Sequence, residues 1–81
     1  MSLFKLTRLG LVEELTLLIN WGDIDINIRE RGSGDSALMV AVAENDLSIG
    51  RILVDVGHID LNIVNVMGNT ALHIAADSGY V

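Results

Sequence analysis

The sequence predicts an all-α solenoid built from stacked helix-turn-helix units, each followed by an extended arm. Three observations predict this fold. Two sequence blocks recur with nearly one period, apolar residues within each period have the spacing of a helix face, and an alternating segment closes the period. One such unit cannot bury its own apolar face, whereas several stacked units can.

The period is read from two independent blocks. The segment 22–28, GDIDINI, returns at 57–63 as GHIDLNI, 35 positions later. The segment 34–38, GDSAL, returns at 68–72 as GNTAL, 34 positions later. Self-similarity at a fixed period of this length is the signature of a repeat architecture.

Each period starts with a short helix. Ser36 and Thr70 are natural N-caps, because a hydroxyl oxygen can accept from a free backbone N–H of the first turn. Apolar residues then recur at i, i+3 and i+4, which makes one helix face; they are Leu38, Ala41 and Val42 in one copy, and Leu72, Ala75 and Ala76 in the next. Asn45 and Gly79 are expected to close these helices in the left-handed conformation.

A second helix and an extended arm complete the unit. The helix is predicted from about Leu47 to Val54 and carries the bulky residues Ile49, Ile52 and Leu53. Gly57 is expected to end it. The segment 59–63, IDLNI, alternates apolar and polar residues, which is typical of a short extended arm.

The last unit is similar to a known family. The segment 68–79, GNTALHIAADSG, closely resembles the ankyrin repeat, whose core reads G-x-T-P-L-H-x-A-A-x-x-G in a period of about 33 residues. Its one departure is Ala71 in place of proline. The middle unit matches more loosely, with Ser36, Met39 and Asn45 in place of the family's Thr, His and Gly. In the first unit the helices match through Leu3, Phe4, Leu6 and Gly10.

The resemblance implies short β-hairpin tips on the all-α solenoid. It also implies a single domain, 1–81, with repeat 1 at 1–33, repeat 2 at 34–67 and a partial repeat 3 at 68–81. The second helix of the third unit, which is expected to bury Leu72, is missing. We therefore expect an array truncated within its third repeat and belonging to a longer one. The uncovered face is also expected to favour self-association.

Composition and charge exclude several classes of partner. Eighty-one residues form one domain at most. The net charge is −6 and the few basic residues are scattered, so no nucleic-acid partner is expected. No apolar run reaches the ~20 residues that cross a bilayer, and the start of the chain does not predict a signal peptide. The absence of cysteine fits a cytoplasmic or nuclear location.

No convergent set of catalytic or metal-binding groups is found, so neither enzyme activity nor a cofactor is expected. The resemblance implies that His73 makes structural hydrogen bonds within and between neighbouring turns. His58 with Asp55 and Asp60 is a weak metal-ligand set, because it offers only one imidazole.

The remaining polar candidates have structural explanations. Asp25 and Asp60 alternate with isoleucines on the arm and are expected on its solvated face. Glu13 and Glu14 suit the first turn of a helix, and 32–34, GSG, suits a hairpin tip. Trp21 is expected to pack over the end of a helix; the alternative is a binding anchor.

By resemblance, the chain is expected to be a non-catalytic scaffold for protein–protein interaction. Ankyrin partners usually meet the concave surface formed by the tips and the first helix of each unit. Carried onto this sequence, that surface comprises Arg8, Arg31, Ser33, Asp35, Ala43, Glu44, Asn65, Val66, Met67, Asn69, Asp77 and Ser78.

Val66 and Met67 are the most informative of these positions, because exposed apolar residues at a tip suggest a covering partner. Local packing against the neighbouring tip is the open alternative. A rival hypothesis makes the chain a targeting or regulatory segment of a larger enzyme or channel, and a third makes it a small homo-oligomer joined through its uncovered face.

Overall fold

The computed structural model describes residues 3–22, 24–56 and 58–78. Within these ranges the chain forms five α-helices: α1 (Leu3–Leu9), α2 (Val12–Trp21), α3 (Ala37–Ala43), α4 (Leu47–Asp55) and α5 (Ala71–Ser78). The same ranges contain no β-sheet; an isolated antiparallel bridge joins Arg29 to Ser36. The predicted all-α fold is confirmed, whereas the tips are hydrogen-bonded turns without strands.

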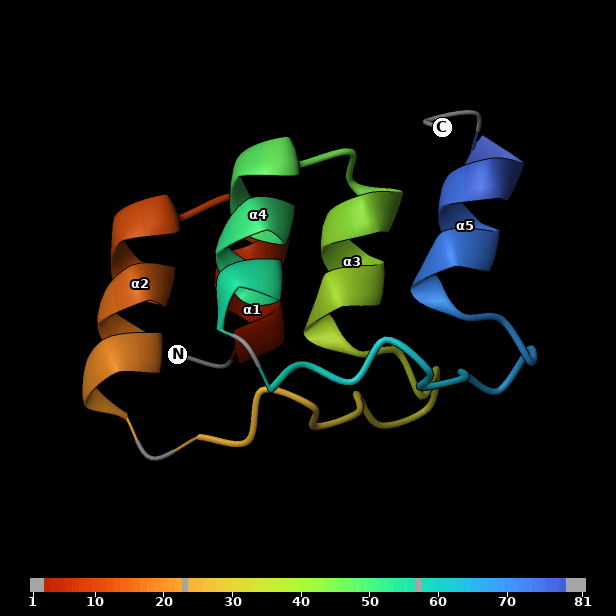
Figure 1. Cartoon of the computed structure of the whole chain (residues 1–81), viewed down its shortest axis with the longest axis horizontal. Helices are drawn as coiled ribbons and strands as arrows, with labels where there is room; N and C mark the ends of the chain where they lie inside the picture. Colours follow the sequence, from red (N-terminus) through yellow and green to blue (C-terminus); the bar gives the residue numbers. More distant parts are fainter. Residues whose placement is uncertain (1–2, 23, 57, 79–81) are drawn as a thin grey trace.

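The helices stand side by side in two rows (Figure 1). In the inner row α3 packs between α1 and α5, and in the outer row α2 packs against α4. The connecting segments 24–36 and 58–70 run together along one end of the helices (Figure 1). The molecule measures 33 × 22 × 22 Å, so the units line up along one axis instead of surrounding a common centre.

Two of the inner-row helices, α1 and α3, end in the same way. Gly10 follows α1 with φ 68°, and Asn45 follows α3 with φ 54°. After each of them, the next N–H donates to a carbonyl five positions back, at 3.1 and 2.9 Å. This is the left-handed closing motif expected at Asn45. The corresponding predictions for Gly57 and Gly79 lie outside the described residues.

Side-chain caps start three of the helices. Ser36 and Thr70 begin α3 and α5 as predicted, since each hydroxyl oxygen accepts from the N–H three residues further on at 3.3 Å. Asp46 caps α4 in a way that the sequence analysis missed: its Oδ1 accepts from Ile49 N at 3.1 Å. Each such cap stabilises its helix by about 1 kcal/mol.

The core lies between the two rows. Its fully buried members include Leu15 from α2, Met39 from α3, and Ile49 and Leu53 from α4. Burial of Ile49 and Leu53 confirms the predicted apolar side of α4. Each buried aliphatic side chain of this size contributes about 1.5–3 kcal/mol through the hydrophobic effect.

The expectation of an extended arm at 59–63 is wrong. Asp60 accepts at Oδ1 from the N–H two residues on, at 2.9 Å, and Asp25 does the same in the first unit. These side-chain contacts bend the backbone into a turn. Leu61 is consequently 54% exposed, although strict alternation would place it beside the isoleucines. The aspartates shape turns; they do not form one face of a strand.

Asn27 joins the first connecting segment to the second. Its Nδ2 donates to His58 O at 3.1 Å, and its Oδ1 accepts from Asp60 N at 2.6 Å. One side chain thereby satisfies two backbone groups of the next repeat, which fixes the register between the units.

The expectation that Trp21 packs over a helix end is also wrong. Its side chain is 86% exposed at the end of α2, and Leu17, one turn earlier, is 57% exposed. Both residues belong to α2, a helix of the outer row. The binding-anchor alternative for Trp21 stays open.

Candidate functional site

Two hairpin tips project from the connecting segments. The first tip comprises residues 29–35 and the second tip residues 64–69. In each, the N–H of the second residue donates to the carbonyl of the last, at 2.8 Å in the first tip and 3.0 Å in the second. Gly32, Gly34 and Gly68 have positive φ values of 88°, 73° and 77°, which glycine adopts without steric cost.

The tips pack directly against each other. Val66 N donates to Ser33 O at 2.9 Å, and Asn65 Nδ2 donates to Asp35 Oδ1 at 2.9 Å. The approach is close at Gly34, where an added Cβ would lie 3.2 Å from Val66 N. The two tips therefore form one continuous surface, which we call the tip surface.

The second tip is held from within by Asn65. Its Oδ1 accepts from Met67 N at 2.9 Å and from Asn69 N at 3.0 Å. The side chains of Val66 and Met67 nevertheless remain 69% and 78% exposed. Packing against the neighbouring tip thus involves the Val66 backbone and leaves most of both side chains in water, which contradicts the local-packing alternative.

An ion pair ties α1 to the first tip. Arg8 Nη1 donates to Glu30 Oε2 at 2.6 Å, and Nη2 donates to Oε1. This hydrogen bonding raises the pKa of Arg8 and lowers the pKa of Glu30. The side chains are 44% and 26% exposed, so solvent screening limits the gain in stability to less than about 1 kcal/mol. Glu30 was missed from sequence because no local pattern links it to Arg8.

Most of the predicted contact residues are exposed: Arg8, Arg31, Ala43, Glu44, Val66, Met67 and Asp77. Those that shape the tips are half-buried: Ser33, Asp35, Asn65 and Asn69. Ser78 is the last residue of α5, and its side chain lies outside the described part of the chain. The structure joins Arg8 and the two tips by hydrogen bonds. Ala43, Glu44 and Asp77 lie at the carboxyl ends of α3 and α5, at the other end of these helices from the tips.

The histidines have structural surroundings. His73 Nδ1 accepts from Thr70 N at 3.1 Å and so stabilises the start of α5, which confirms the within-turn part of the bonding that the resemblance implied. His58 is exposed and offers its backbone oxygen to Asn27. Across ranges 3–22, 24–56 and 58–78, no group of three His, Cys, Asp or Glu residues is arranged to hold a metal ion.

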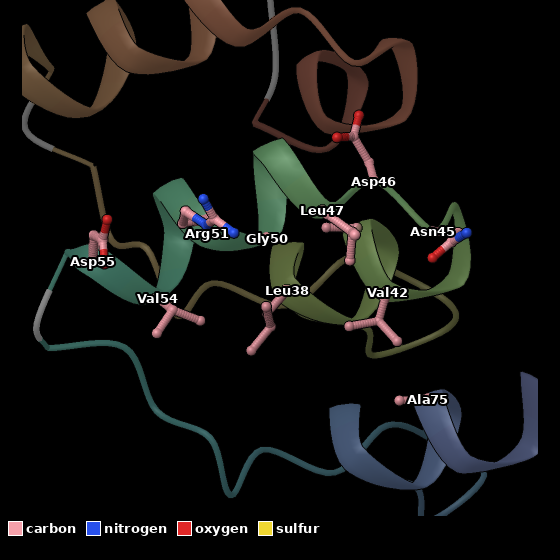
Figure 2. Close-up of a pocket in the computed structure, with 11 residues that line it drawn as sticks. Leu38, Val42, Asn45, Asp46, Leu47, Gly50, Arg51, Val54, Asp55 and Ala75 are labelled. Carbon is pink, nitrogen blue, oxygen red and sulfur yellow. The ribbon is translucent and has the colours of Figure 1, made fainter. Parts of the chain in front are cut away.

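An apolar groove lies between α4 and α5 (Figure 2). Leu38 and Val42 of α3 form its floor, Leu47 and Val54 of α4 form one wall, and Ala75 of α5 faces them. Its volume is about 340 Å³. The groove can take apolar side chains and is a second candidate contact surface.

None of the described helices is long and apolar enough to cross a membrane.

Comparison with known sequences identifies the repeats. A family model described as ankyrin repeats, in three copies, matches residues 3–81. The chain is 44% identical over 61 residues to ankyrin repeat and SAM domain-containing protein 6 of Danio rerio, a match that covers 75% of this chain and 8% of that protein.

Two further relatives both have kappa-B in their names. The chain is 38% identical over 66 residues to the nuclear factor NF-kappa-B p105 subunit of Gallus gallus, covering 82% of this chain and 7% of that protein. It is 32% identical over 66 residues to the I-Kappa-B like protein C2 of Microplitis demolitor bracovirus (isolate Webb), covering 82% of this chain and 36% of that protein. The chain thus spans only a minor part of each relative's length.

The family match over 3–81, the two-row stacking and the tips at each unit boundary agree with one another. The chain belongs to the ankyrin repeat family.

Proposed function

We propose that this chain is a non-catalytic scaffold whose protein partner lies against the tip surface. The observation that carries this proposal is the exposure of Val66 and Met67, at 69% and 78%, on a backbone fixed by hydrogen bonds. Adjacent apolar side chains held in water gain free energy when a partner covers them, at about 25 cal/mol per Å². Because the backbone is already ordered, little conformational entropy is lost on binding.

The flanking residues have two proposed roles. Arg8 and Arg31 contact the partner beside the tips. Four residues at the carboxyl ends of α3 and α5 contact it further along the inner row: Ala43, Glu44, Asp77 and Ser78. Ser33, Asp35, Asn65 and Asn69 are half-buried and hydrogen-bonded within or between the tips. These four residues hold the tip surface in shape, and their exposed atoms also contact the partner.

The experiment compares capture by three immobilised chains: wild type, the double variant Val66→Asp with Met67→Asp, and Val12→Asp. Val12 is the matched control, because it is an exposed apolar residue at the start of α2, outside the tips and the groove. Proteins retained from a cell extract are quantified by mass spectrometry, and circular dichroism checks that each variant keeps its helices. We expect the double variant to lose the proteins that wild type and Val12→Asp retain. Equal retention by the double variant refutes the proposed surface.

The rival proposal makes the chain a targeting or regulatory segment of a larger enzyme or channel. The small share of each relative that the chain covers, 8%, 36% and 7%, supports a place within a longer polypeptide or a longer ankyrin array. The repeat boundaries at 33/34 and 67/68 remain part of this proposal. The complete reading frame distinguishes a pure array from a segment attached to another domain.

A third proposal is self-association through the groove between α4 and α5. Leu47, in the wall of the groove, is 76% exposed. Leu72, in an adjoining hollow that shares Leu38, Val42 and Ala75 with the groove, is 72% exposed, so a second copy that covers this face buries both. Light scattering over a concentration series, with Leu72→Glu as the disrupting variant, tests this directly. A strict monomer at all concentrations contradicts it.

We further propose a cytoplasmic or nuclear location and a role without nucleic acid, membrane insertion or cofactor.

A further inference from the structure

We propose that the partner segment bound at the tip surface is acidic and apolar: it places a carboxylate against Arg31 of the first tip and an apolar side chain over Val66 and Met67 of the second. This rests on the proposed function and specifies the chemistry of the partner at the same surface.

The carboxylates of the first tip are already occupied. Glu30 accepts both hydrogen bonds from Arg8, and Asp35 Oδ1 accepts from Asn65. In contrast, the guanidinium groups of Arg29 and Arg31 are exposed, and neither has a side-chain hydrogen bond or ion pair among the residues that the structure describes. The first tip and Arg8 together carry three guanidinium groups, those of Arg8, Arg29 and Arg31, against the two carboxylates of Glu30 and Asp35. Their net charge is therefore +1, even though the whole chain carries −6.

The charge and the apolar pair occupy matching places in consecutive repeats. Arg31 follows Glu30, whose N–H closes the first tip, and Val66 follows Asn65, whose N–H closes the second. The hydrogen bond from Val66 N to Ser33 O holds the two tips together. An extended segment that crosses both tips meets a guanidinium at one and apolar side chains at the next.

The carboxyl ends of α3 and α5, which also belong to the proposed contact surface, repel a carboxylate. Glu44 caps the carboxyl end of α3 and Asp77 lies in the last turn of α5, and neither last turn contains a basic residue. The negative ends of the two helix dipoles add to this potential. An acidic group on the partner is consequently steered toward Arg31 and away from the carboxyl ends of α3 and α5.

A nucleic acid is a poorer match for the same charge. Affinity for a phosphate backbone grows with the number of phosphates that basic side chains neutralise. The tips offer two unpaired guanidinium groups beside an apolar pair, and the acidic remainder of the chain repels a polyanion.

The test is selection from a random linear peptide library displayed on phage, with the intact 81-residue chain immobilised. The variants are Arg31→Glu, Val66→Asp with Met67→Asp, and Arg51→Glu. Arg51 is the matched control, because it is exposed on α4 and its reversal changes the net charge by the same amount, from −6 to −8. Binding of a selected synthetic peptide is then measured by fluorescence anisotropy, with a single-stranded oligonucleotide as competitor.

We expect wild type and Arg51→Glu to select peptides that carry Asp or Glu within a few residues of Leu, Ile, Met or Phe. Arg31→Glu should weaken the selected peptide by about tenfold, since an attraction is replaced by a repulsion, and the oligonucleotide should not compete. Selected peptides without an acidic bias, or an unchanged affinity for Arg31→Glu, overturn this inference alone. Selection that is insensitive to Val66→Asp with Met67→Asp, or no selection by wild type, overturns the proposed surface as well. Displacement by the oligonucleotide overturns the inference in favour of nucleic acid.

Discussion

The turn after α1 should respond strongly to a single methyl group at Gly10. Two features of the structure predict this. Gly10 has φ 68°, in the left-handed region that costs other residues about 1–2 kcal/mol. A Cβ added there would also lie 2.9 Å from Asp46 Oδ2, and Asp46 is the residue that caps α4.

The two costs can be separated with a second glycine. Gly32 has φ 88°, and an added Cβ would meet nothing within 4 Å, so Gly32→Ala carries the backbone cost alone. Gly10→Ala carries the same backbone cost and also displaces the Asp46 carboxylate, whose cap contributes about 1 kcal/mol. We therefore expect a loss of about 1–2 kcal/mol for Gly32→Ala and about 2–3 kcal/mol for Gly10→Ala.

Urea denaturation followed by circular dichroism measures both losses, and thermal melts should show Tm values that differ by about 4–8 °C between the two variants. In an Asp46→Ala background the excess cost of Gly10→Ala should vanish, because no cap is left to displace. Equal losses for Gly10→Ala and Gly32→Ala in the wild-type background would refute the coupling between this turn and the start of α4.

Three further predictions concern packing, helix closure and charge. Leu53→Ala should cost about 2–5 kcal/mol in urea denaturation, because Leu53 is fully buried between the rows; a loss below 1 kcal/mol would contradict that burial. Asn45→Gly should stabilise the chain by a few tenths of a kcal/mol, since Asn45 holds φ 54° where glycine is better suited; a lower Tm would contradict this. The pKa of Glu30 is lowered by Arg8, so the stability from this pair is present at neutral pH and is lost as pH falls below the ordinary carboxyl range of about 4.3. Denaturation at a series of pH values should show less acid sensitivity for Glu30→Gln than for wild type, by under about 1 kcal/mol, and an identical profile would exclude a contribution from the pair.

Helices and their caps were predictable because their signals are local. The spacing of Ile49 and Leu53 indicated a buried helix face, and Asn45 indicated a left-handed closing residue. Ser36 and Thr70 also took their predicted roles, since a hydroxyl before a helix has few better partners than the free N–H groups of the first turn.

The structure of the connecting segments was predicted less well, because an alternating pattern alone does not distinguish a strand from a series of turns. The Asp60 carboxylate accepts a hydrogen bond from the backbone N–H two residues further on. This side-chain bond to the backbone bends the alternating segment into a turn. The prediction that Trp21 packs over a helix end was wrong because the neighbouring residues in the sequence do not reveal which residues lie near Trp21 in space. The same reason hid Glu30, whose partner Arg8 is 22 positions away.

The candidate site was predicted in outline and not in its contacts. The exposure of Val66 and Met67 followed from their place at a tip. The bond from Val66 N to Ser33 O did not, because it depends on how closely two repeats approach at Gly34.

The central claim is that consecutive repeats are joined through their loops, so that the two tips form one fixed surface. Amide hydrogen exchange of the isotope-labelled chain, followed residue by residue by NMR, tests this most directly at Val66 and Asp60, whose N–H groups donate to the preceding repeat. We expect both amides to exchange at least about a hundredfold more slowly than in an unfolded chain, and Asn27→Ala to accelerate exchange at Asp60 while leaving Val66 protected. Exchange of both amides at unfolded-chain rates, with the helices still protected, would contradict it.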